Sequence, residues 1–191
     1  MGLVKSTQAG KIAAMRKLKN EELNRPDIEA FKATDKLPVV VVMDNVRSMH
    51  NVGSAFRSAD AFGITSIALC GITAQPPHRE IHKTALGATE SVDWKYYENT
   101  RSACEVLKAE GYTIMAVEQA EGSIPLQDFK PIENQKVAIV LGNEVFGVED
   151  EIVELADGCL EIPQFGTKHS LNVSVTAGIV LWDLVSKMKL A

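Results

Sequence analysis

The feature that most limits the possible folds is an uninterrupted apolar run in the first quarter of the chain. Residues 37–44 read LPVVVVMD, with four successive valines before a polar end. β-Branched side chains favour strands, and a run without polar alternation is typical of a strand buried on both faces of a parallel sheet. We therefore predict that this segment is an inner strand of an α/β domain.

Strand and helix patterns alternate along the rest of the chain. Residues 54–62 place apolar side chains at helical spacing, with Ser54 as a candidate cap and Gly63 as the end of the helix. Further strands are predicted at residues 66–70, 93–97, 112–117, 136–141 and 158–162, and further helices at residues 101–110, 150–155 and 172–188. Such alternation predicts an α/β fold with a mostly parallel sheet and helices on both faces.

Length and hydropathy indicate one domain in an aqueous compartment. The chain has 191 residues, of which 46% are hydrophobic, enough for one sizeable core. We expect residues 1–14 to form a disordered tail, residues 15–36 an N-terminal helical extension, and residues 37–191 the main domain. No apolar stretch reaches the roughly 18 to 20 residues of a membrane span. The sequence therefore predicts a cytoplasmic protein without a membrane partner.

Cysteine usage and net charge narrow the function classes. Cys70, Cys104 and Cys159 are far apart and include no C-x-x-C pair, so we expect buried free thiols in a reducing cytosol, with no metal site and no disulfide. The net charge of −5 disfavours nucleic-acid binding, because phosphate contacts usually come from a basic face. Basic residues crowd the N-terminal region, however, so a local basic face remains compatible with the sequence.

Three separated segments rich in glycine and asparagine predict a ligand site. They are residues 45–63, 141–147 and 162–179, and each combines such residues with an apolar run. The first two follow predicted strands, and ligands of open α/β sheets bind outside the carboxyl ends of the strands. Neither G-x-G-x-x-G nor G-K-[ST] occurs, which disfavours a Rossmann-type NAD or ATP site.

Together these segments resemble the SpoU (TrmH-like) branch of the SPOUT RNA methyltransferases over about residues 37–184. Three motifs in the family's order and at matching separations make the resemblance specific, and residues 83–92 also resemble the family's loop that faces the active cavity. The motif residues are Asn45, Asn51, Gly53, Arg57, Phe62 and Gly63; then Leu141, Gly142, Asn143, Glu144 and Gly147; then Ile162, Pro163, Gly166, Ser170, Leu171, Asn172, Val173, Ser174, Ala177 and Gly178.

The resemblance implies a fold, a reaction and partners. It implies a deep trefoil knot within about residues 137–185, formed around a pocket for S-adenosylmethionine. It also implies methyl transfer to a ribose 2′-hydroxyl of structured RNA, by a homodimer in which the partner completes the RNA site. Because a minimal catalytic domain must recognise its substrate with little more than residues 15–36 added, we expect tRNA slightly more than rRNA. The 2′-hydroxyl distinguishes RNA from DNA, so DNA is not expected as a partner.

The family's cofactor residues carry over to eight positions. The loops of the second and third motifs would hold S-adenosylmethionine mainly through backbone groups, beside apolar walls, and the end of the strand at residues 112–117 would border them. We expect glycines there because backbone approaches a ligand closely only without a Cβ. The eight positions are Val117, Glu118, Leu141, Gly142, Asn143, Gly147, Ile162 and Leu171.

The resemblance assigns the chemistry to five residues, with Arg57 in the key role. The arginine of this motif is often described as the base that takes the 2′-hydroxyl proton. A guanidinium with a pKa above about 12 is a poor base, so we expect Arg57 to bind an RNA phosphate and stabilise the oxygen as it loses its proton. Asn51 would fix Arg57 or the ribose, and Glu144 would orient that network. Ser170 and Asn172 would hold the loop and the substrate by hydrogen bonds.

Each of these assignments has a simpler alternative interpretation. Arg57 could be a surface ion-pair partner of Asp60, three residues further along a helix. His78 and His82 lack the glutamate spacing of H-E-x-x-H and indicate a surface role rather than zinc. The alternative function is a non-catalytic RNA- or ligand-binding module on the same fold. The presence of all five expected catalytic residues favours the enzyme.

Overall fold

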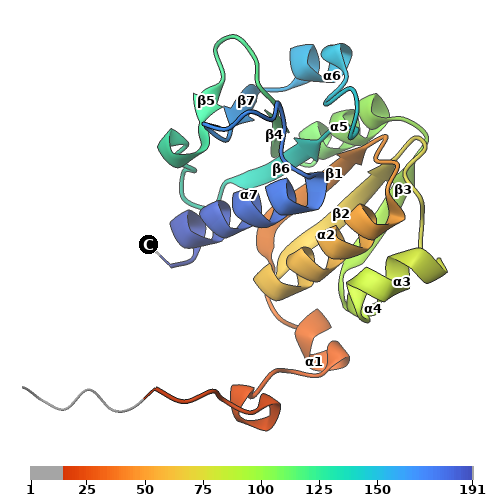
Figure 1. Ribbon diagram of the computed structural model, residues 1–191, viewed down its shortest axis with the longest axis vertical. Helices are drawn as coiled ribbons and strands as arrows, with labels where there is room; N and C mark the ends of the chain where they lie inside the picture. Colours follow the sequence, from red (N-terminus) through yellow and green to blue (C-terminus); the bar gives the residue numbers. More distant parts are fainter. Residues whose placement is uncertain (1–14, 191) are drawn as a thin grey trace, which may run out of the picture.

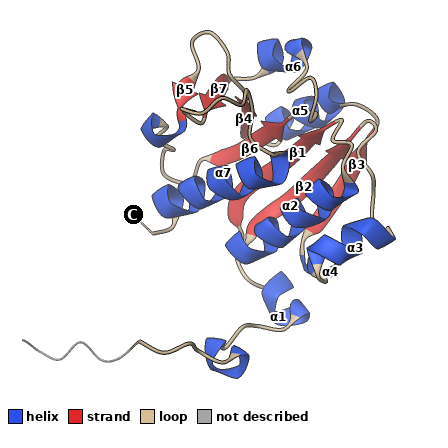
Figure 2. Ribbon diagram, viewed as in Figure 1, coloured by secondary structure: helices blue, strands red, loops and turns tan. Residues whose placement is uncertain are grey.

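A parallel sheet forms the centre of the molecule (Figures 1 and 2). The computed structural model describes residues 15–190, and within them seven strands pair in the order β3-β2-β1-β6-β4-β7-β5, every pairing being parallel. The strands are β1 Leu37–Asp44, β2 Ile64–Cys70, β3 Asp93–Tyr97, β4 Tyr112–Val117, β5 Ile124–Pro125, β6 Lys136–Leu141 and β7 Gly158–Glu161. The predicted α/β class is therefore confirmed, with β5 as a short edge strand that the sequence did not indicate.

Helices cover both faces of this sheet. Figure 1 shows α2 and α7 side by side on one face, and these two helices are in contact. The helices are α1 Ile28–Lys32, α2 Met49–Phe62, α3 Arg79–Ala85, α4 Ala88–Ser91, α5 Thr100–Ala109, α6 Asp150–Leu155 and α7 Val173–Met188, with short 3₁₀ helices at Asn20–Leu23 and Leu126–Asp128. No helix in the described range combines the length and apolarity needed to cross a membrane.

The valine run of β1 supplies both cores. Val39, Val41 and Met43 pack into the core that includes residues of α2 and α7. Val40 and Val42 pack into the opposite core, with residues of α5 and α6. Successive strand side chains point to opposite faces, so a strand covered on both sides needs apolar residues at every position.

Helix α2 begins five residues earlier than the sequence predicted. Its cap is Ser48, whose side chain accepts a hydrogen bond from the backbone N–H of Asn51, and not Ser54. Gly63 ends the helix in the left-handed conformation, as expected. The glycine and asparagine of this N-terminal turn have low helix propensity, but Asn51, Val52 and Gly53 are buried in the packed helix. Asn51 is therefore fixed by a helix.

The segment at residues 83–92, which the resemblance described as a loop, is mostly helical. The end of α3 and all of α4 fall in this range, and α3 packs closely against α2. Within residues 15–36 the chain forms a short 3₁₀ helix and α1, which contacts α4. The division into extension and main domain stays a prediction, and the predicted tail at residues 1–14 lies outside the described residues.

The three cysteines are free thiols in the structure, and the predicted burial is confirmed for two of them. Cys70 and Cys104 are buried, and Cys159 is half-buried. Burial raises the pKa of the Cys70 thiol to about 12 and that of Cys104 to about 11. Both therefore stay protonated and pack as small apolar side chains.

A buried carboxylate ends β1 and ties three segments together. Asp44 is fully buried and accepts hydrogen bonds from the Thr100 hydroxyl at 2.5 Å, the Asn45 side-chain amide at 3.0 Å and the backbone N–H of Glu149 at 3.0 Å. A buried charge is tolerated only when it is satisfied in this way. Asp44 thus holds the loop before α6 and the start of α5 at the carboxyl end of β1.

We expect Asp44→Ala to lower the free energy of unfolding by about 3 kcal/mol, because three donors would lose their acceptor. Asp44→Asn keeps one carbonyl oxygen and should lose less. Urea denaturation of the three proteins at neutral pH measures the difference. Equal stability of Asp44→Ala and the unchanged protein would contradict this role.

Candidate active site

A cavity of about 300 Å³ lies where β4, β6 and β7 end. Its walls come from the residues after β4, the loop between β6 and α6, and the loop between β7 and α7. All eight predicted cofactor residues line it, together with two of the predicted catalytic residues: Val117, Glu118, Leu141, Gly142, Asn143, Gly147, Ile162, Leu171, Glu144 and Ser170. Three segments far apart in sequence thus meet in one cavity; two of them are the second and third motif segments, and no residue of the first motif lines it.

Further residues of the cavity were not predicted. They belong to the same elements and, apart from Val173 of the third motif, lie at positions that the motifs do not name. Leu160 lies on β7, and Val173 and Thr176 lie on the first turns of α7, so strand and helix periodicity could have indicated them. The additional lining residues are Gln119, Val145, Phe146, Leu160, Gln164, His169, Val173 and Thr176.

A tight turn at residues 143–147 explains the two glycines that flank it. The backbones of Asn143 and Gly147 exchange two hydrogen bonds of 2.9 Å, and Gly147 has φ +74°. A Cβ on Gly142 would lie 2.0 Å from the carbonyl carbon of Gly147, and a Cβ on Gly147 would lie 2.2 Å from a carboxylate oxygen of Glu118. The turn's own backbone requires both glycines. The close approach at Gly142 is therefore to the backbone of the turn itself, and not only to a bound ligand.

The Glu144 carboxylate connects this turn to the start of α2. It accepts hydrogen bonds of 2.9 Å from the backbone N–H groups of Arg47 and Ser48. It also accepts one of 2.9 Å from the side-chain amide of Asn51. The side-chain oxygen of Asn51 in turn accepts a hydrogen bond of 3.1 Å from Asn172. Three predicted catalytic residues, one from each motif, therefore form one continuous network.

These hydrogen bonds keep Glu144 ionised. Partial burial opposes the charge, but the backbone donors of Arg47 and Ser48 and the Asn51 amide favour it, and the net effect holds the pKa of Glu144 below its ordinary value. The carboxylate also lies at the N-terminus of α2, where the helix dipole favours negative charge. At neutral pH the group is an acceptor only, suited to orienting Asn51.

Asn172 also fixes the start of α7. Its side-chain oxygen accepts hydrogen bonds from the backbone N–H groups of Ser174 at 2.9 Å and Val175 at 3.4 Å, which makes it the N-cap of the helix. Its amide nitrogen is then left to donate to Asn51. Ser170, two residues earlier, is exposed on the cavity wall.

Arg57 is the one predicted catalytic residue that belongs neither to the cavity wall nor to the hydrogen-bond network. It is exposed on α2 and lines a second cavity, of about 600 Å³, with residues between 25 and 31 and with parts of α2, α3 and α4. The proposed ion pair with Asp60 is absent from the described structure. The Asp60 carboxylate instead accepts a hydrogen bond of 2.5 Å from the Ser91 hydroxyl.

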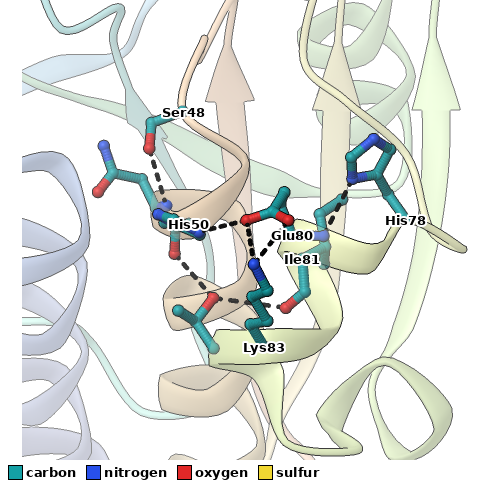
Figure 3. A network of polar contacts seen from close by, with 8 residues as sticks. Ser48, His50, His78, Glu80, Ile81 and Lys83 are labelled. Carbon is teal, nitrogen blue, oxygen red and sulfur yellow. Dashed lines mark hydrogen bonds and ion pairs between the residues drawn. The ribbon is translucent and has the colours of Figure 1, made fainter.

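Histidines near the site make local contacts (Figure 3). His50 pairs with Glu80 at 2.9 Å, and Lys83 pairs with the same carboxylate at 2.8 Å. The hydrogen bond from Lys83, and to a smaller extent the one from His50, holds the pKa of Glu80 below its ordinary value. His78 caps α3 through its Nδ1, which accepts from the backbone N–H of Glu80 at 3.2 Å. Residues 15–190 contain no cluster of three or more metal-ligating side chains.

The fold and the cavity define an α/β protein that binds a small ligand with loops at the carboxyl ends of its parallel strands. The sequence matches the model of the SpoU rRNA Methylase family over residues 38–182. The chain therefore belongs to this family, and the resemblance of its three motifs is confirmed.

Individual relatives include enzymes for two RNA classes. The chain is 30% identical over 163 residues to the tRNA (guanosine(18)-2′-O)-methyltransferase of Thermus thermophilus, covering 85% of this chain and 81% of that enzyme. It is 31% identical over 165 residues to the 23S rRNA (guanosine-2′-O-)-methyltransferase RlmB of Vibrio parahaemolyticus, covering 86% and 66%. An AdoMet-bound rRNA methyltransferase from Sinorhizobium meliloti shares the fold, with a TM-score of 0.73, 27% identity, and coverage of 81% of this chain and 59% of that chain.

We expect Gly142→Ala to weaken S-adenosylmethionine binding by about tenfold or more, because the new Cβ forces the turn to open. Gly166→Ala is the matched control, since a Cβ there meets no atom within 4 Å. Titration calorimetry with both variants measures the affinities. Equal affinity of Gly142→Ala and the control would show that the turn does not shape the pocket.

The lowered pKa of Glu144 predicts a pH-dependent contribution to stability. A carboxylate with a depressed folded pKa stabilises the protein above its unfolded pKa, and that contribution is lost as the pH falls through the folded value. We expect Glu144→Gln to cost about 1 kcal/mol at neutral pH. The gap to the unchanged protein should close below about pH 4. Urea denaturation across this range checks it, and a gap independent of pH would contradict it.

Proposed function

We infer that this chain is an RNA 2′-O-ribose methyltransferase that takes its methyl group from S-adenosylmethionine. The observation that carries this inference is the hydrogen-bonded chain from Glu144 through Asn51 to Asn172, which joins the three motif segments beside one cavity. The relatives named above are 2′-O-methyltransferases of tRNA and rRNA. A cytoplasmic location, where both RNA classes are found, is part of the proposal.

The cavity suits the proposed cofactor. Leu141, Leu160 and Ile162 offer apolar walls for an adenine ring, and the turn at residues 143–147 presents backbone groups at the rim. Glu118 and Asn143 add polar side chains for the ribose or the amino acid end. When bound, S-adenosylmethionine supplies a methyl group on a positively charged sulfur, ready for transfer to an oxygen nucleophile.

The chain's own residues would align the ribose and manage its proton. Asn51 is held by Glu144 and Asn172, so its position is fixed before RNA arrives. The Arg57 guanidinium serves as a phosphate ligand and electrostatic stabiliser of the 2′-oxygen, not as a base. A phosphate oxygen or water accepts the proton. Ser170 is placed on the cavity wall to hold the substrate.

The position of Arg57 supports a homodimer with shared active sites. Arg57 does not line the cofactor cavity of its own subunit. Beside α2, helix α7 exposes an apolar stripe at helical spacing, formed by Val175, Ile179 and Trp182, and Trp182 is 54% exposed. We propose that a second copy packs on this stripe and that Arg57 of one subunit serves the cofactor cavity of the other.

The C-terminal part of the proposal is a trefoil knot within about residues 137–185. Two features support it. The loop between β7 and α7 meets the end of β4, where the Gln119 side chain donates a hydrogen bond of 2.6 Å to the His169 carbonyl. Helix α7 then returns across β1 and β6 to pack against α2.

Between the two RNA classes, tRNA is slightly favoured. The chain aligns with 81% of the tRNA-modifying relative from Thermus thermophilus but with 66% of the rRNA-modifying relative from Vibrio parahaemolyticus. Transfer of radiolabelled methyl from S-adenosylmethionine to unmodified tRNA and, separately, to unmodified rRNA tests the activity and its class. Label in neither pool, despite measurable cofactor binding, would overturn the proposal.

Arg57→Ala should abolish methyl transfer but leave S-adenosylmethionine affinity unchanged, because the cofactor contacts come from other loops. Mixing it with Gly142→Ala tests whether Arg57 acts across the interface. If it does, and S-adenosylmethionine is kept at a concentration that leaves the weakened Gly142→Ala cavity largely empty, a random mixture of the two chains restores about a quarter of the unchanged activity. Half the dimers are then mixed, and each mixed dimer has one intact site. If Arg57 acts within its own subunit, no intact site forms and no activity returns.

A further inference from the structure

Two largely solvent-exposed phenylalanine rings lie beside the cofactor cavity. Phe146 is 85% exposed and Phe165 is 98% exposed, whereas Phe56 in the core is fully buried. Phe146 lines the cavity, and Phe165 directly follows Gln164, which also lines it. A phenylalanine ring held in water forgoes the free energy of burial, so two of them at one cavity mouth indicate a partner that covers them.

The exposure of Phe146 is built into a rigid turn. The Asn143 side-chain oxygen accepts hydrogen bonds from the backbone N–H groups of Val145 at 2.8 Å and Phe146 at 3.3 Å. Its amide donates to the carbonyl of Asn45 at 2.8 Å, and its backbone pairs twice with Gly147. These bonds fix the backbone that carries the Phe146 ring, so the ring is held at the mouth of the cavity before a ligand arrives.

Phe165 lies on the opposite loop, which is also anchored. The Gln119 side chain donates to the carbonyl of His169, four residues after Phe165. The loop otherwise presents polar groups, including the exposed cation of Lys168. An aromatic ring with a nearby cation suits a ligand with a flat π-face and a phosphate, more than it suits a purely apolar partner.

We propose that Phe146 and Phe165 form a stacking platform for an unpaired base of the substrate RNA at the mouth of the cofactor cavity. This rests on the proposed function, which it deepens by naming the form of the substrate. Unpaired RNA bases stack on exposed aromatic rings, and such stacking tolerates any base. The enzyme therefore takes its target from a loop or another unstacked region, and a continuous duplex is a poor substrate.

Binding measurements on variants test the platform. Phe146→Ala and Phe165→Ala should each weaken binding of an unmodified tRNA transcript by about tenfold, the size of one lost base–aromatic stack. Phe165 is not part of the cavity lining, so Phe165→Ala should leave S-adenosylmethionine affinity unchanged. The Phe→Tyr variants should bind normally, and the Phe→Leu variants should resemble Phe→Ala, because area alone does not replace a π-face. Ile132→Ala is the matched control. This residue is 73% exposed but lies before the amino end of β6, whereas the cavity lies at the carboxyl ends of the strands.

Other outcomes would overturn the platform. Lost cofactor affinity with normal RNA binding would assign the rings to the cofactor, and lost dimers in ultracentrifugation would assign them to the subunit interface. Phe165→Trp gives a direct readout: single-stranded oligouridylate should quench the added fluorescence, and an abasic ribose-phosphate oligomer should not. This readout needs no methyl transfer. Absent quenching with intact methylation would reject the platform alone, and quenching without methylation would reject the reaction alone.

Discussion

The carboxylate of Glu144 is the interaction on which the site depends. It gathers two backbone donors and one amide at the N-terminus of α2, from residues more than 90 positions earlier in the chain. Through Asn51 the same network reaches Asn172, which starts α7. One ionised group thereby sets the relative positions of the two helices and of the turn that shapes the cavity. Charged acceptors at helix N-termini are well suited to this, because both the hydrogen bonds and the helix dipole favour them.

The parallel sheet makes such a network feasible. Because the strands are parallel, their carboxyl ends lie on the same side of the sheet. Loops that are distant in sequence therefore begin close to one another. Asp44 performs the same task one layer deeper, with every donor around its buried carboxylate drawn from a different segment. Two carboxylates thus hold the segments of the site together: Asp44, which is buried at the end of β1, and Glu144, which lies at the N-terminus of α2.

Much of this could be predicted from the sequence, for physical reasons that differ by element. The valine run of β1 identified a doubly covered strand because burial on both faces leaves no room for polar alternation. The eight residues that the resemblance assigns to the cofactor all line one cavity at the strand ends. The start of α2 did not follow, since tertiary packing overrides the weak propensity of its glycine and asparagine.

Two properties of the site were beyond sequence reasoning. The six-residue spacing places Asn51 and Arg57 on different sides of α2, but which side meets the network and which a separate cavity depends on what packs around the helix. The exposure of Phe146 and Phe165 was equally hidden, since a phenylalanine is more often buried than presented. Both depend on side-chain surroundings that no residue pattern encodes.

Helix α2 also fixes the distance and the angle between Asn51 and Arg57. Asn51 and Arg57 are separated along its axis by about 9 Å, six residues at the rise of an α-helix. An inserted or deleted residue between them would rotate Arg57 by about 100° relative to Asn51. This stretch of helix should therefore tolerate substitutions on its exposed face but not changes in length, because its residue count sets the angle between two functional groups.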